Sequence, residues 1–67
     1  MKGWTRVPGA TGAWIRADGA RVWLATYQPG VWAKRGPYDR TGFAQSQMDG
    51  TARLFYTGEQ ALAWLDR

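Results

Sequence analysis

The chain has 67 residues, nine Lys or Arg against five Asp or Glu, and neither His nor Cys. This length allows one small domain, and the missing Cys excludes disulfide bonds and thiolate metal sites. The missing His removes the commonest general base and the commonest transition-metal ligand, so we expect no enzyme, no metal and no cofactor. The core must rest on five Trp, three Tyr and two Phe.

The formal net charge of +4 favours an acidic partner, either nucleic acid or an anionic protein surface. The same excess is also ordinary solubility charge for a small domain. No apolar run reaches the roughly 18 residues that a membrane span needs, and residues 1–6 show no apolar signal-peptide core. We therefore expect a cytoplasmic protein that does not enter a membrane.

The clearest local signal is the Asp18-Gly19 pair, which lies between two alternating segments. It predicts a hairpin with a two-residue type I′ turn, after an irregular lead-in over residues 1–12. Side chains alternate along a strand, so the hairpin has an aliphatic face and an aromatic and basic face. The facing pairs in this register are Ala17 and Ala20, Arg16 and Arg21, Ile15 and Val22, and Trp14 and Trp23. The aliphatic face then holds Ala13, Ile15, Val22 and Leu24.

Beyond the hairpin, Gln28-Pro29-Gly30 predicts a turn and residues 31–35 alternate as a third strand. If Val31 and Ala33 join the aliphatic face, Trp32 and Lys34 join the aromatic and basic face. A loop over residues 36–42 follows, with Arg35 and Arg40 at its rim.

A second Asp-Gly pair, Asp49-Gly50, predicts another hairpin between residues 43–48 and 51–56. Thr57 followed by Gln60 is a capping-box pattern that begins a helix over residues 57–67. So short a helix must pack on the sheet, and the aliphatic face is available. The predicted fold is therefore a single α+β domain over residues 1–67. Its antiparallel sheet of three to five strands, with two Asp-Gly hairpins, spans residues 13–56, and one C-terminal helix packs on one face.

This arrangement leaves the aromatic and basic face open. Cations neutralise phosphates and aromatic planes stack on bases, so the face favours nucleic acid, with duplex DNA as the expected form. Arg16 opposite Arg21 would be destabilising, and an anion between them would relieve the repulsion. The candidate binding residues are Trp14, Arg16, Arg21, Trp23, Tyr27, Trp32, Lys34, Arg35 and Arg40.

Other interpretations stay open. The rings could form a second small core covered by residues 1–12 or 36–48, and the cations could be solvated charges. Trp, Tyr and Arg are also typical of interface hot spots, which favours a small phage-encoded inhibitor that docks on an acidic host protein. An exposed edge strand would allow a homodimer.

Residues 53–65, RLFYTGEQALAWL, resemble the strand-to-helix end of the small domain that precedes the catalytic part of phage integrases. Residues 12–16 and 18–24 are similar to the first hairpin of those domains and of plant AP2-type domains. Both families place a three-stranded sheet on a helix and bind DNA through the free sheet face. The resemblance implies an accessory or regulatory role in a phage or mobile element, with Arg16, Arg21, Trp23 and Lys34 on the binding face. Residues 31–50 are an extra segment relative to that pattern.

Overall fold

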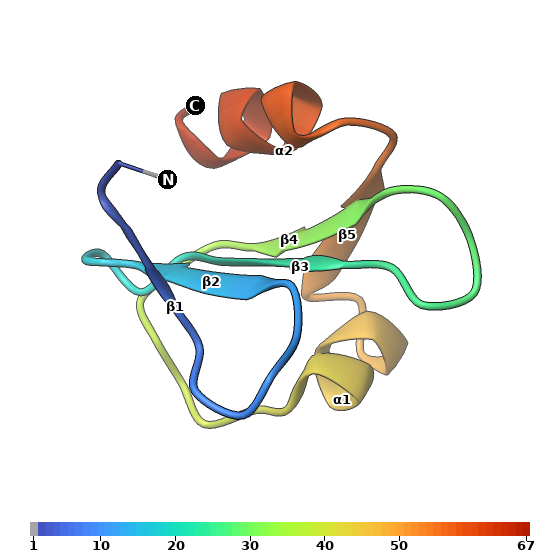
Figure 1. Ribbon diagram of the computed structural model, residues 1–67, viewed down its shortest axis with the longest axis horizontal. Helices are drawn as coiled ribbons and strands as arrows, with labels where there is room; N and C mark the ends of the chain where they lie inside the picture. Colours follow the sequence, from blue (N-terminus) through green and yellow to red (C-terminus); the bar gives the residue numbers. More distant parts are fainter. Residues whose placement is uncertain (1) are drawn as a thin grey trace.

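The computed structural model describes residues 2–67 and contains one sheet with a helix on each face (Figure 1). Each strand pairs antiparallel with the next, so the strand order in space is β1-β2-β3-β4-β5. The predicted α+β class, with an antiparallel sheet and a C-terminal helix, is confirmed. The elements are β1 (Trp4–Arg6), β2 (Ala13–Arg16), β3 (Arg21–Leu24), β4 (Val31–Lys34), α1 (Phe43–Met48), β5 (Ala52–Phe55) and α2 (Gly58–Leu65).

The first hairpin turns at Asp18-Gly19 as predicted, but its loop is one residue longer. The Arg16 N–H donates to the Ala20 carbonyl at 2.8 Å, and the Gly19 N–H donates to the Arg16 carbonyl at 2.9 Å. Gly19 has a φ of +89°. These features describe a three-residue loop in which a type I turn is followed by a glycine bulge, an alternative that Asp-Gly suits equally well.

The longer loop shifts the β2–β3 register by one residue, so the predicted pairing is wrong. Because the side-chain period of a strand is two, this shift moves one strand's side chains to the opposite face of the sheet. Trp14 and Arg16 therefore lie on the face opposite Arg21 and Trp23. The observed pairs are Ala13 with Trp23, Trp14 with Val22, and Ile15 with Arg21.

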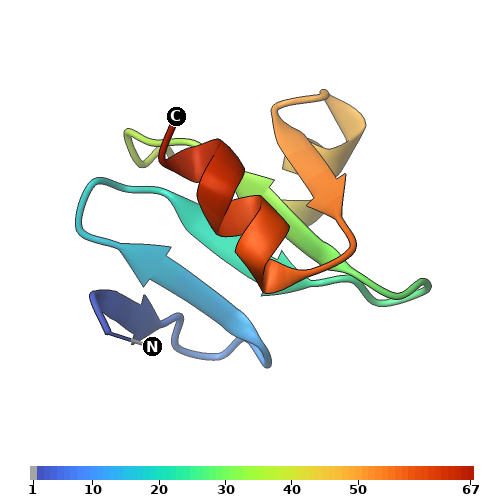
Figure 2. The same cartoon turned by 90° about the horizontal axis from the view of Figure 1, so that it is seen from above.

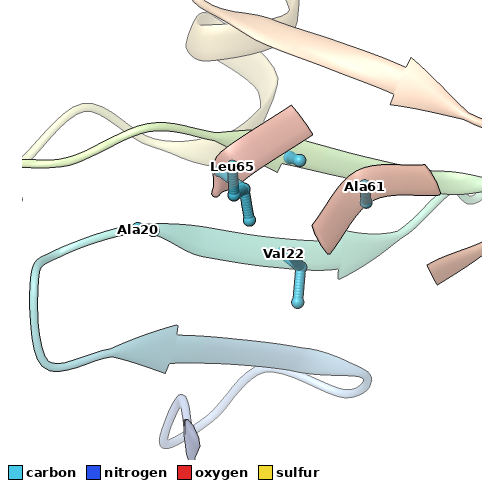
Figure 3. Close-up of a cluster of buried hydrophobic side chains, with 5 residues drawn as sticks. Ala20, Val22, Ala61 and Leu65 are labelled. Atoms are coloured by element: carbon cyan, nitrogen blue, oxygen red, sulfur yellow. The ribbon is translucent and has the colours of Figure 1, made fainter. Parts of the chain in front are cut away.

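Helix α2 covers one side of the sheet, called here the α2 face. Its buried Ala61 and Leu65 pack with Ala20, Val22 and Ala33 (Figure 3). The capping box predicted at the start of this helix is present: the Gln60 N–H donates to Thr57 Oγ1 at 3.2 Å, and the Thr57 N–H donates to Gln60 Oε1 at 3.2 Å. The small alanines on both sides let the helix lie close to the strands.

The opposite side, the α1 face, carries the largest departure from prediction. Residues 43–48, expected as the first arm of a second hairpin, form helix α1, so Asp49-Gly50 links a helix to a strand. Phe43 and Ser46 are three residues apart and lie on one side of the helix. Phe43 stacks on Trp23, and the buried Ser46 accepts a hydrogen bond from Lys34 Nζ at 3.0 Å. These two contacts favour the helix over the strand.

The segment expected to be irregular contains strand β1, which pairs with β2 and forms one edge of the sheet. The chain then returns to the α1 face, where Val7 and Ala10 pack beside Ala13 and Trp23. Residues before the first hairpin thus contribute to both faces.

Candidate functional site

The nine candidate binding residues divide into three groups. Cross-strand partners share a face of a sheet, so the pairs Arg21–Lys34 and Trp23–Trp32 belong together on the α1 face. Trp14 and Arg16 lie on the α2 face. The remaining candidates lie outside the strands and are Tyr27, Arg35 and Arg40.

Trp23 is the centre of a second small core on the α1 face and is only 5% exposed. Its ring stacks on Phe43 with centroids 4.6 Å apart, and its Nε1 donates to Gln47 Oε1 at 3.2 Å. Trp32 packs partly buried beside it. Helix α1 and the segment around Val7 cover these rings, so Trp23 and Trp32 do not form the open surface that the sequence predicted.

Arg21 and Lys34 are buried on the same face and share one carboxylate, that of Asp39. Arg21 Nη2 lies 3.1 Å from Asp39 Oδ1, and Lys34 Nζ lies 3.1 Å from Asp39 Oδ2. The pKa of Asp39 falls to about 2, because the Thr41 backbone N–H and then the Lys34 ammonium stabilise its charged form. Arg21 also donates from Nη1 to the Thr41 carbonyl at 2.8 Å. These two cations hold the 39–41 loop to the sheet.

The three candidates outside the strands point in different directions. The Arg35 guanidinium lies 4.1 Å from the centroid of the Trp64 ring and donates to the Trp64 carbonyl at 2.7 Å, so it fastens α2 to the end of β4. Arg40 is exposed and forms no ion pair within residues 2–67. Tyr27 is 99% exposed in the β3–β4 loop.

An aromatic and basic surface does exist, but on the other side of the sheet. Figure 2 shows α2 crossing above β3 and β4, while β1 and β2 lie beside it. On these two strands Trp4 pairs with Arg16, and Arg6 pairs with Trp14, so rings and guanidinium groups alternate. We call this set of four residues, Trp4, Arg6, Trp14 and Arg16, the β1–β2 surface.

Each guanidinium of the β1–β2 surface lies near an indole. Arg16 lies 5.3 Å from the centroid of Trp4, and Arg6 lies 6.0 Å from that of Trp14. Arg6 is exposed, whereas the two indoles are partly exposed. An exposed cation beside a partly exposed ring offers both a charge and an apolar plane to a ligand.

Arg16 differs from Arg6 because it is already neutralised. It pairs with Asp18 at 2.7 Å and with Asp66 at 2.6 Å, which joins the first hairpin to the end of α2. The pKa of Asp18 falls to about 2, chiefly through the hydrogen bonds from Arg16 and then through the Ala20 N–H, and the pKa of Arg16 is raised in return. Arg6 has no carboxylate partner in the described part of the chain. It is therefore the free charge of this surface.

Trp4 and Arg6 are absent from the nine predicted residues. A signal for them is nevertheless present, because Trp4-Thr5-Arg6 repeats the spacing of Trp14-Ile15-Arg16. Two segments with the same alternation suit neighbouring strands that expose the same face. The glycines and proline around the first segment obscured that pattern.

Comparison with known proteins finds no matching family model, no similar curated protein and no similar solved structure. Within the described residues, no helix has the length and apolar character needed to cross a bilayer. No three His, Cys, Asp or Glu side chains of residues 2–67 gather where they could hold a metal ion.

Proposed function

We propose that the protein binds nucleic acid through the β1–β2 surface, with Arg6 as its principal free cation. The observation that carries this proposal is the alternation of Trp4, Arg6, Trp14 and Arg16 on two strands that lie beside α2. The two indoles pack at the border of the core under α2 and stay partly exposed. Arg6 would neutralise a phosphate, while Trp4 and Trp14 would offer apolar surfaces to the sugars of the backbone. Arg16 would position the Trp4 ring more than it would supply charge, because Asp18 and Asp66 already pair with it.

Duplex DNA is the form that we propose. The two strands of the surface are about 5 Å apart, and a two-stranded ribbon fits the major groove, which is about 12 Å wide. The resemblance to the integrase-type domain supports the same class of ligand. The proposed binding surface differs from that of the integrase-type domain, which binds DNA through the sheet face away from its helix. In this protein α1 covers that face. A cytoplasmic accessory or regulatory role in a phage or mobile element is part of this proposal.

The test is fluorescence anisotropy with a labelled mixed-sequence duplex and with its single strand, at about 50 mM and about 200 mM salt. We expect binding that weakens with salt, and at least a threefold loss of affinity in Arg6→Gln. Arg40→Gln is the matched control, since it removes the same charge from an exposed arginine on the other side of the sheet. No binding of either probe at the lower salt concentration, or equal losses in the two variants, would contradict the proposal.

A second candidate is docking on a protein, favoured by exposed apolar side chains at one end of the sheet. Tyr27 and Tyr56 are 99% and 77% exposed, and a hollow lined in part by Pro29 and Leu54 lies beside Tyr56. Aromatic side chains of this kind dominate many protein interfaces. The test is capture of a partner from host lysate after nuclease treatment. Loss of capture in Tyr27→Ser, with capture kept in Arg6→Gln, would favour docking over nucleic-acid binding.

A further inference from the structure

A hollow of about 350 Å³ opens on the α1 face, away from the β1–β2 surface. Its walls are mostly apolar and include Val7 and Ile15 from the N-terminal half of the chain and Tyr38 and Phe43 from the segment that covers the face. Arg21 and Arg40 also line it. The volume is at the lower end of the range for small-molecule sites, which is about 300–1,000 Å³.

The charges around this hollow do not balance. Arg21 and Lys34 are each 5% exposed, yet Asp39 is the one carboxylate that pairs with either of them within the described residues. Arg40 is exposed and is the second cation that lines the hollow, after Arg21. Two cations, Arg21 and Arg40, therefore lie on the wall of the hollow, and within the described residues only Arg21 has a carboxylate partner.

The hydrogen bonds of Arg21 also leave one of its donors without a partner. Its Nη1 donates to the Thr41 carbonyl and its Nη2 to Asp39, but its Nε is buried and has no hydrogen-bond partner within residues 2–67. The guanidinium carbon lies 5.0 Å from the Tyr38 ring and 6.0 Å from the Phe43 ring. A buried cation that is not fully satisfied is unfavourable unless another negative group approaches it.

We propose that this hollow binds a small organic carboxylate whose apolar part is about the size of one aromatic ring. The apolar part would lie against Ile15 and Phe43, which removes apolar surface from water. The carboxylate would face Arg40 and the edge of the Arg21 guanidinium, and so give Arg40 the negative partner that it lacks within the described residues. Tyr38 would close the hollow from the solvent side of Arg21. This site is independent of nucleic-acid binding, because it lies on the other face of the sheet.

The probes for this site are 4-phenylbutyrate and its neutral analogue 4-phenylbutanol, titrated into the full chain while amide shifts and Trp fluorescence are recorded. We expect the carboxylate to bind with a Kd below about 1 mM and at least tenfold more tightly than the alcohol. The largest shifts should fall on the amides of Tyr38, Thr41 and Phe43. Trp23 fluorescence should change as well, because this ring stacks on Phe43.

Two charge-matched variants separate the site from the β1–β2 surface. Arg40→Gln should weaken the binding of 4-phenylbutyrate by about tenfold and leave the binding of 4-phenylbutanol unchanged. Arg6→Gln should leave the affinity for both probes unchanged. Both side chains are exposed, so both variants should fold. Equal binding of acid and alcohol, shifts confined to the β1–β2 surface, or no saturation by either probe would overturn the proposal. None of these results would bear on nucleic-acid binding, which the anisotropy measurement tests separately.

Discussion

Arg21 lies directly opposite Lys34 in the β3–β4 pairing, so two buried cations face each other across neighbouring strands. Like charges in such a pair repel, and Asp39 offsets the repulsion by placing one carboxylate oxygen near each cation. The sequence predicted a repulsive pair at Arg16 and Arg21 that an external anion would relieve. The observed pair involves a different partner, and the protein supplies a carboxylate of its own.

This arrangement predicts a specific loss of stability in acid. The pKa of Asp39 is about 2 in the folded protein against 3.8 ordinarily, so the unfolded chain binds the proton more readily. The stabilisation is fully present above about pH 4 and disappears as the pH falls towards 2. Urea unfolding followed by Trp fluorescence should therefore give a midpoint that drops through this window. The lowered pKa of Asp18 acts in the same direction.

Asp39→Asn isolates the contribution of that carboxylate. The variant should be less stable than the parent at pH 7, because Arg21 and Lys34 stay buried without their shared partner. It should also lose less further stability between pH 4 and pH 2. Glu59→Gln is the control, since it removes one negative charge that forms no ion pair within the described residues. Parallel pH curves for Asp39→Asn and the parent would contradict the assignment.

The first hairpin shows why the register could not be derived from the pattern of residues. Asp-Gly suits both the predicted two-residue turn and the observed three-residue loop, and the two differ by one residue in pairing. Burial normally decides between such registers, because one face is apolar and the other polar. Here the consecutive residues Trp14 and Ile15 are both apolar. Each face of the sheet therefore receives one apolar side chain in either register, and burial does not distinguish the two. The observed register is stabilised instead by contacts between residues far apart in the chain, such as the stacking of Trp23 on Phe43.

The two helices differ in how far local contacts determine them. Helix α2 begins at a capping box formed by Thr57 and Gln60, which are only three residues apart, so local sequence was sufficient. Helix α1 has only six residues, and its N-cap is Gly42, which has no side chain that could accept a capping hydrogen bond. Its buried Ser46 accepts a hydrogen bond from Lys34, which lies in strand β4. A contact of this kind has no local signature.

Gly19 provides a direct test of the observed loop. Its φ of +89° is in the left-handed region, and a Cβ there would lie 2.1 Å from the backbone nitrogen of Tyr38. Gly19→Ala should therefore add a clash to the backbone strain of about 1–2 kcal/mol. Gly9→Ala is the matched control, because Gly9 has a φ of +76° with no atom within 4 Å of the added Cβ. Urea unfolding should show the larger loss for Gly19→Ala, and equal losses would argue against the close approach of Tyr38.

The cap of α2 predicts a moderate and local effect. Thr57→Ala removes the Oγ1 that accepts the Gln60 N–H and should reduce the free energy of unfolding by about 0.5–2 kcal/mol. Gln60→Ala removes the reciprocal hydrogen bond, and the double variant should lose less than the sum of the two single changes. Thr26→Ala, in the exposed β3–β4 loop, is the control and should change the unfolding free energy by no more than about 0.5 kcal/mol. Full additivity of the two changes at the cap would show that the capping hydrogen bonds act independently.

The nucleic-acid proposal makes a quantitative prediction about salt. Each phosphate contact by a cation contributes about −0.9 to the slope of log affinity against log salt for duplex DNA. If Arg6 contacts a phosphate, Arg6→Gln should reduce the magnitude of that slope by roughly one, whatever the sequence of the duplex. Arg40→Gln should leave the slope unchanged, although it lowers the net charge of the protein equally. A slope reduced to the same extent in both variants would mean that overall charge, and not the β1–β2 surface, attracts the DNA.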